Sequence, residues 1–84
     1  MRHGPDIAKV AAMIGDPGRA NMLTALLNGA ALTASELALE ANVTKQTASS
    51  HLAKLVEGGL VAVEAQGRHR YYRLADADVA GLLE

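Results

Sequence analysis

Apolar residues recur at every third or fourth position along the N-terminal third of the chain, which is the spacing of one face of an α-helix. We expect a first helix from Asp6 to Ile14, capped by Asp6 and ended by Gly15. Asp16 followed by Pro17 is a typical helix start, because aspartate caps free amides and proline fits the first turn. The apolar face of this second helix comprises Met22, Leu23, Leu26 and Leu27, and Asn28-Gly29 ends it.

Two further helices are expected on either side of a short turn. Thr33 and Glu36 have capping-box spacing, in which each side chain bonds to the other residue's free amide. Asn42 marks the turn, because asparagine tolerates left-handed backbone angles, and Thr44 caps the next helix, Lys45 to about Glu57. In that helix Ala48, Leu52 and Leu55 share a buried stripe, Lys45, Gln46, Ser49, Ser50 and Ala53 lie opposite, and Gly58-Gly59 ends it.

The C-terminal part predicts a hairpin and a last helix. Leu60 to Gln66 alternates in polarity, Tyr71 to Leu74 is a second short strand, and the stretch from Gly67 to Arg70 forms a basic tip between them. Tyr71 and Tyr72 face opposite ways, so we expect one in the core and the other against the hairpin. Asp76 or Asp78 caps a last helix through Val79, Leu82 and Leu83.

These elements predict a mainly α fold with a small β-hairpin. The predicted order is helix, helix, strand, helix, helix, strand, strand, helix, which is a winged helix-turn-helix. The 84 residues suffice for one domain, and the prediction assigns 1–84 to it. Without cysteine there is no disulfide or thiolate metal site, and no apolar run approaches the roughly 20 residues that span a bilayer. We expect a cytoplasmic protein.

Charge is distributed unevenly, although the net charge is only −1. Residues 45–73 carry five cations against two carboxylates, a net of +3, whereas residues 1–44 carry −1 and residues 74–84 carry −3. A basic segment within a near-neutral domain suits a defined face that contacts phosphates.

The predicted helix after Asn42 has the side chains that a DNA-reading helix needs. A major groove about 12 Å wide admits one α-helix, whose outward face needs small hydrogen-bonding groups and a few cations. The hairpin tip then reaches a neighbouring minor groove or the backbone. Candidate DNA contacts are Thr44, Lys45, Gln46, Thr47, Ser49, Ser50, His51 and Lys54 on the helix, and Arg68, His69, Arg70 and Tyr71 on the hairpin.

Three stretches cover most of the chain: Ile14 to Leu27, Leu37 to Leu55 with Gly59-Leu60-Val61, and Gly67 to Leu74. Together they resemble the arsenic-repressor (ArsR/SmtB) family of bacterial regulators, and the last stretch is similar to the family's wing. It implies a homodimeric transcription factor, usually a repressor released by a ligand, on a palindromic operator. It also implies dimerisation through the first and last helices, here Ile7, Val10, Ile14, Val79, Leu82 and Leu83.

The chain departs from the family's metal-sensing patterns. Ser35, Leu37 and Ala38 stand where family sensors have cysteines, and Asp76 and Asp78 occur without histidine in the last helix. We therefore assign no metal and no cofactor, and the resemblance does not identify the inducer. The last helix is short beside that of the family, which is consistent with a DNA-binding fragment of a longer chain.

Two other functions are weighed against DNA binding. A winged helix used for protein interaction is the main alternative, although such modules often lack a basic wing and a polar recognition face. Catalysis is remote, because Ser50 and His51 are helical neighbours whose side chains point apart, and no catalytic triad is evident. We expect a non-enzymatic protein.

Overall fold

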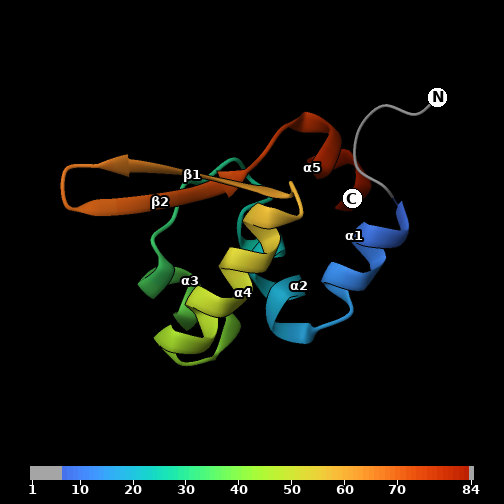
Figure 1. Ribbon diagram of the computed structural model, residues 1–84. Coiled ribbons are helices and arrows are strands. Elements are labelled where there is room, and N and C mark those ends of the chain that lie inside the picture. The colour runs from blue at the N-terminus through green and yellow to red at the C-terminus, as the bar shows by residue number, and fades with distance from the viewer. Residues whose placement is uncertain (1–6, 84) are drawn as a thin grey trace.

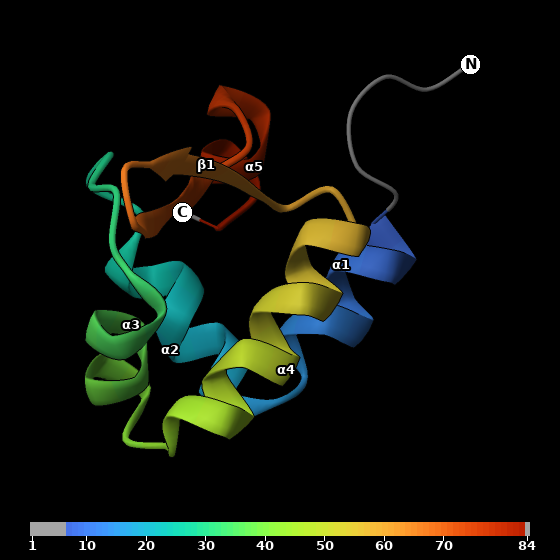
Figure 2. The same ribbon diagram turned by 60° about the vertical axis from the view of Figure 1, so that its left-hand side comes forward.

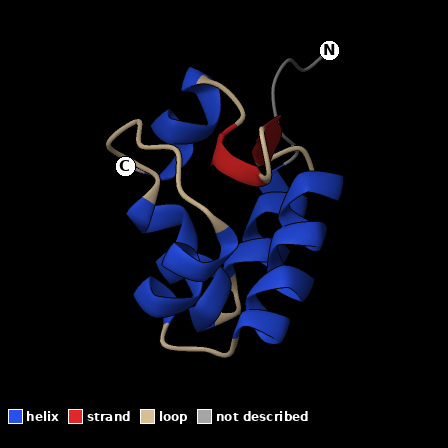
Figure 3. Ribbon diagram, turned by 90° about the vertical axis from the view of Figure 1, so that its left-hand side faces the viewer, coloured by secondary structure: helices blue, strands red, loops and turns tan. Residues whose placement is uncertain are grey.

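The computed structural model describes residues 7–83, apart from the side chains of residues 7–9 and 82, as a group of helices from which a hairpin projects (Figure 1). This part of the chain contains five helices and two strands, with the helices forming the body of the molecule (Figure 3). In chain order they are α1 (Ile7–Ile14), α2 (Pro17–Ala25), α3 (Ala34–Ala41), α4 (Lys45–Glu57), β1 (Val61–Gln66), β2 (His69–Leu74) and α5 (Ala77–Leu83). The predicted winged helix-turn-helix is confirmed.

Side chains cap the helices largely where the sequence predicts. The Asp16 carboxylate accepts hydrogen bonds from the amides of Gly18 at 2.7 Å and Arg19 at 3.2 Å, at the start of α2. Thr33 and Glu36 form the expected capping box of α3. At α5 the amide of Val79 donates to Asp76, so Asp76 and not Asp78 is the cap. The predicted cap Asp6 lies outside the described residues.

A left-handed residue sets the sharp turn between α3 and α4. Asn42 has φ of 57° and ψ of 48°, and within residues 7–83 no other non-glycine residue has a positive φ. Thr44 caps the next helix by accepting a hydrogen bond from the amide of Thr47 at 3.1 Å. The turn and the cap together fix the direction in which α4 leaves α3, as Figure 2 shows.

The hairpin turn is tighter than the sequence predicts. Gln66 pairs with His69, so the tip consists of Gly67 and Arg68 alone, and His69 and Arg70 belong to β2. Gly67 has φ of +61°, the conformation that glycine supplies at the first position of a two-residue type II′ turn. The predicted second strand, Tyr71 to Leu74, therefore begins two residues too late.

The predicted strand before the third helix is a single residue. Leu32 forms a bridge with Tyr72, in which the Leu32 amide donates to Tyr72 at 2.9 Å and the Tyr72 amide donates back at 2.8 Å. Tyr72 also packs against the core, so of the two tyrosines it is the one expected inside. These contacts attach the base of the hairpin to the helices.

The core is continuous from α1 to α5. α2 contributes Met22 and Leu23, and the residue after it, Leu26, is also fully buried. The stripe predicted on α4 is confirmed, because Ala48, Leu52 and Leu55 have no exposed surface. The other large, fully buried side chains are Leu37, Leu60 and Val79.

The helices expected to form a dimer lie at the end of the molecule away from the hairpin tip (Figure 1). Val10 and Val79 are buried within one protomer, so little of either side chain is left to contact a second one. Ile14 and Leu83 are half-buried against the same core. The side chains of Ile7 and Leu82 lie outside the described residues, and the dimer interface stays a prediction.

Candidate nucleic-acid interface

The outward face of α4 is polar from its first residue. Because Ala48, Leu52 and Leu55 turn inward, most of the residues between them turn away from the core. The exposed polar side chains up to Lys54 are those of Lys45, Gln46, Thr47, Ser49, Ser50 and Lys54. Amides, hydroxyls and ammonium groups thus stand together on an open surface, where they can hydrogen-bond to base edges and phosphates.

Two hydroxyls at the start of α4 are partly used within the protein. The Thr44 hydroxyl accepts a hydrogen bond from the Thr47 amide and donates its own proton to the Thr47 hydroxyl at 3.0 Å. Thr44 is therefore committed as a cap, whereas Thr47 keeps a free O–H donor. Of the two predicted contacts, Thr47 is the better placed to reach a ligand.

An open groove of about 640 Å³ lies between α4 and the hairpin. Lys45 and Ser49 line it from α4, and Arg68 and Arg70 line it from the hairpin. Residues that are far apart in the sequence thus meet on one concave surface, with three cations around it. Glu36 of α3 is the carboxylate that lines it.

Alternation along β2 decides which cations face α4. Arg70 lies on the same face of the strand as Tyr72, whose side chain packs against the core, and Arg73 lies on the opposite face. His69 and Tyr71 pair on that opposite face, with ring centroids 6.3 Å apart. Tyr71 is half-buried, as expected for the tyrosine that packs against the hairpin.

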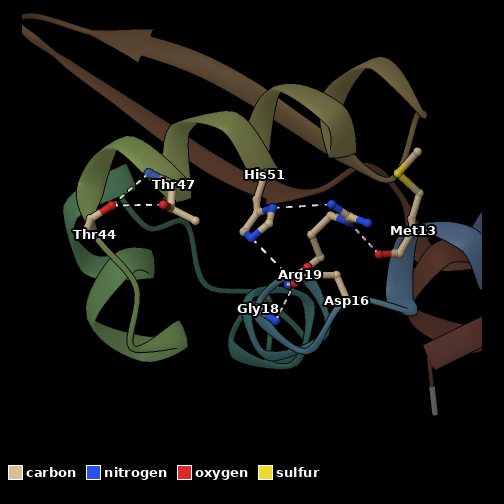
Figure 4. A network of polar contacts seen from close by, with 7 residues as sticks. All are labelled: Met13, Asp16, Gly18, Arg19, Thr44, Thr47 and His51. Carbon is tan, nitrogen blue, oxygen red and sulfur yellow. Dashed lines mark hydrogen bonds and ion pairs between the residues drawn. The ribbon is translucent and has the colours of Figure 1, made fainter.

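His51 does not share the outward face of its neighbours. Its side chain is only 15% exposed, and it turns from α4 toward the start of α2 (Figure 4). There Nε2 lies 3.5 Å from the Asp16 carboxylate and Nδ1 lies 3.3 Å from the Arg19 guanidinium. The structure thus gives His51 two partners inside the protein, which its prediction as a DNA contact did not foresee.

The pKa of the Asp16 carboxyl is lowered by its contacts in the same cluster. The hydrogen bond from the Arg19 amide holds the pKa of the Asp16 carboxyl below its ordinary value of 3.8. The Gly18 amide and the positive charge of Arg19 act in the same direction, as does His51 whenever its ring is protonated, and partial desolvation opposes them. Asp16 thus carries a negative charge beside His51 at neutral pH.

Arg19 is the residue of this cluster that sequence reasoning missed. Its Nε donates to the Met13 carbonyl at 2.7 Å, at the end of α1, while its guanidinium also reaches His51 (Figure 4). The only sequence signal was the position of His51 at the edge of the buried stripe, facing a neighbouring helix. The partner's identity depends on tertiary packing, which spacing alone does not give.

Acidic and imidazole side chains are scattered over the described part of the fold. Within residues 7–83, no three histidine, aspartate or glutamate side chains come together as a metal site would require. Among the described helices, none has the length and apolar character needed to cross a membrane.

The fold and the groove define a winged helix-turn-helix. Proteins of this class bind nucleic acid with the second helix of the helix-turn-helix pair, which is α4 in this chain. The chain belongs to the helix-turn-helix domain family, whose pattern matches residues 14–64, and within it to the ArsR type. It is 51% identical over 80 residues to the HTH-type transcriptional regulator YdfF of Bacillus subtilis. The alignment covers 95% of this chain but only 35% of that relative.

Solved structures agree with this assignment. A homodimeric winged helix-turn-helix DNA-binding domain from Mycobacterium bovis, a possible ArsR-family regulator, has a TM-score of 0.82 and 31% identity, over 92% of this chain and 70% of that one. The cadmium sensor CmtR of Mycobacterium tuberculosis has a TM-score of 0.74 and 34% identity, over 90% of this chain and 78% of that one. Since this chain has no cysteine, it has no thiolate with which to bind such a metal.

Proposed function

We propose that this chain is the DNA-binding part of a bacterial transcriptional regulator that recognises a specific duplex sequence. The observation that carries the proposal is the groove in which Lys45 and Ser49 of α4 meet Arg68 and Arg70 of the hairpin. One element supplies groups that distinguish bases, and the other supplies charges that bind any phosphate backbone. A surface of this composition favours DNA over a protein partner.

Each part of the surface has a separate task. α4 enters the major groove with its N-terminal half, where Gln46 can bond to both edge groups of an adenine and Ser49 and Ser50 can bond to either partner of a base pair. Lys45 lies at the start of the helix, beside partial positive charge that also attracts phosphate. Arg68 and Arg70 hold the neighbouring backbone or minor groove and thereby fix the register of α4.

We further propose a homodimer on a palindromic operator, acting as a repressor in the cytoplasm. The homodimeric state of the Mycobacterium bovis neighbour supports this arrangement. Pairing through α1 and α5 leaves the hairpin tip and the N-terminal half of α4 free, because those helices lie at the opposite end of the molecule (Figure 1). The half-buried Ile14 and Leu83 would contact the second protomer, and the buried Val10 and Val79 would support that surface from within.

Binding, and not catalysis, is the activity we propose. General acid or base chemistry requires a side chain that can exchange a proton with a substrate. Both nitrogens of His51 already face partners inside the protein, and its ring is largely covered. The exposed serines of α4 have no base at hydrogen-bond distance among the described contacts, so they serve as hydrogen-bonding groups.

Selection of bound sites from random duplexes tests the proposal. We expect a palindrome whose half-sites lie about one helical turn, roughly 10 base pairs, apart, because a two-fold dimer presents two copies of α4. Gln46→Ala should select a site altered at one base of each half-site. The control is Thr24→Ala, which changes an exposed residue of α2 outside the groove and should select the same site as the unaltered chain. Failure to enrich any sequence would contradict the proposal.

A further inference from the structure

A polar cluster joins the recognition helix to the junction of α1 and α2. His51 projects from the middle of α4, Asp16 caps α2, and Arg19 links His51 to the Met13 carbonyl at the end of α1 (Figure 4). Three helices thus meet through three side chains. The cluster lies behind the outward face of α4 and not on it, since His51 is 15% exposed while Ser49 and Ser50 are exposed.

The donors and acceptors of the cluster fit only one form of the histidine ring. Arginine carries donors and no acceptor, so the His51 Nδ1 that faces the Arg19 guanidinium must accept. The proton of the neutral ring then lies on Nε2, which faces the negatively charged Asp16 carboxylate at 3.5 Å. The two partners therefore fix both the tautomer and the direction of the ring.

Close packing leaves the ring little freedom. A Cβ atom placed on Gly18 would lie 3.1 Å from Nε2 of His51 and 3.2 Å from its Cδ2, both tighter than ordinary contacts. Gly18 is itself buried at the first turn of α2. A residue without a side chain at this point lets the start of α2 approach the histidine.

α1 touches the recognition helix at a second point as well. A Cβ atom on Gly58, the residue that ends α4, would lie 3.5 Å from the Met13 methyl carbon and 3.6 Å from its sulfur. The Met13 side chain thus borders the end of α4, and the Met13 carbonyl is linked to the middle of α4 through Arg19.

Directional contacts matter here because apolar contacts do not fix rotation. The stripe of Ala48, Leu52 and Leu55 is buried by a force without direction, which tolerates a small turn of α4 about its axis. Hydrogen bonds depend on angle, and recognition needs side chains held within about 10–20°. The cluster supplies the angular restraint that the core lacks.

We propose that Arg19 and His51 are positioning residues for DNA binding, which hold α4 in the rotation that presents its polar face to the groove. The inference rests on the proposed function, because positioning matters only if α4 reads DNA. Neither residue is assigned a contact with the duplex. His51 thus orients the helix whose Gln46, Ser49 and Ser50 contact the duplex, and it does not contact the duplex itself.

The test compares four variants of the 84-residue chain on the duplex selected above. Arg19→Lys keeps the charge but replaces the two separate nitrogens that reach Met13 and His51 by a single ammonium group, and His51→Ala removes the ring. We expect each to weaken binding about fivefold or more, the usual size of a coupling between separate sites. His51→Asn should recover most of the affinity, because its side-chain oxygen can accept from Arg19. Thr24→Ala, which changes an exposed residue of α2 outside the groove, should leave affinity unchanged.

The dependence on salt separates positioning from direct contact. If His51 only positions α4, the slope of log Kd against log salt stays that of the unaltered chain in His51→Ala. A slope reduced by about 1.8, as expected for Arg68→Ala when a dimer loses two phosphate contacts, would show that His51 binds phosphate and overturn the inference. An Arg19→Lys variant that binds the duplex as tightly as the unaltered chain would also overturn the inference.

A measurement without DNA keeps the inference separate from the proposed function. Nitrogen NMR should show the proton of the neutral His51 ring on Nε2 in the unaltered chain, and a changed signal in Arg19→Lys. In the same variant, amide signals along the outward face of α4 should shift while circular dichroism shows the helices retained. A His51 ring protonated on Nδ1, or amide signals unmoved in Arg19→Lys, would overturn the inference even if no duplex were bound.

Discussion

Replacing Arg70 by alanine gives a quantitative test of the groove as a phosphate-binding surface. Each phosphate neutralised on duplex DNA adds about 0.9 to the slope of log Kd against log salt. Lys45, Arg68 and Arg70 line the groove, so six such contacts in a dimer predict a slope of about 5. Arg70→Ala removes two of them and should lower the slope by about 1.8.

Fluorescence anisotropy of a labelled duplex, titrated between about 50 and 200 mM salt, measures this slope directly. Arg73→Ala is the matched control, since Arg73 is exposed on the same strand, has the same charge and lies on its opposite face. There it borders a different hollow, near Asp76. An unchanged slope in Arg70→Ala, or an equal decrease in Arg73→Ala, would refute the assignment of the groove.

Three further predictions concern the stability of the fold. Leu52→Ala should lower the free energy of unfolding by about 2–5 kcal/mol in a denaturant titration, because Leu52 is fully buried, and a loss under about 1 kcal/mol would count against this core. Gly67→Ala places a side chain at φ of +61° and should cost about 1–2 kcal/mol, visible as a lower thermal midpoint; an unshifted midpoint would argue against the type II′ turn. Asp16 has a lowered pKa, so its contribution to stability is present above the ordinary value of 3.8 and is lost as pH falls through the folded value. Asp16→Asn keeps a capping side chain but should remove that acid-dependent loss in unfolding measured over a pH series, and an identical pH profile would contradict the assignment.

Local signals in the sequence are sufficient to predict most helices of this fold. The caps at Asp16, Thr33 and Thr44 each act within three residues of themselves, so their spacing carries the whole interaction. Asn42 is likewise a local choice, because the left-handed conformation depends on one residue's own backbone. The buried stripe of α4 follows from helical periodicity.

The parts that sequence reasoning placed incompletely depend on contacts between distant residues. The hairpin turn follows from the register of Gln66 with His69, which the polarity pattern of either strand alone does not set. Leu32 pairs with Tyr72, forty positions away, and this bridge reduces the predicted strand to one residue. His51 could be placed beside the buried stripe, but not opposite Arg19.

The most direct test of the central claim is an NMR titration of the isotope-labelled chain with the selected duplex. We predict that amide signals shift at the start of α4, from Lys45 to Ser50, and at the hairpin tip, from Gly67 to Arg70. Signals of α5 should move little. Shifts centred on α5 or on the back of α2, with the signals of α4 and the hairpin unmoved, would contradict the claim that these two elements form the DNA-binding surface.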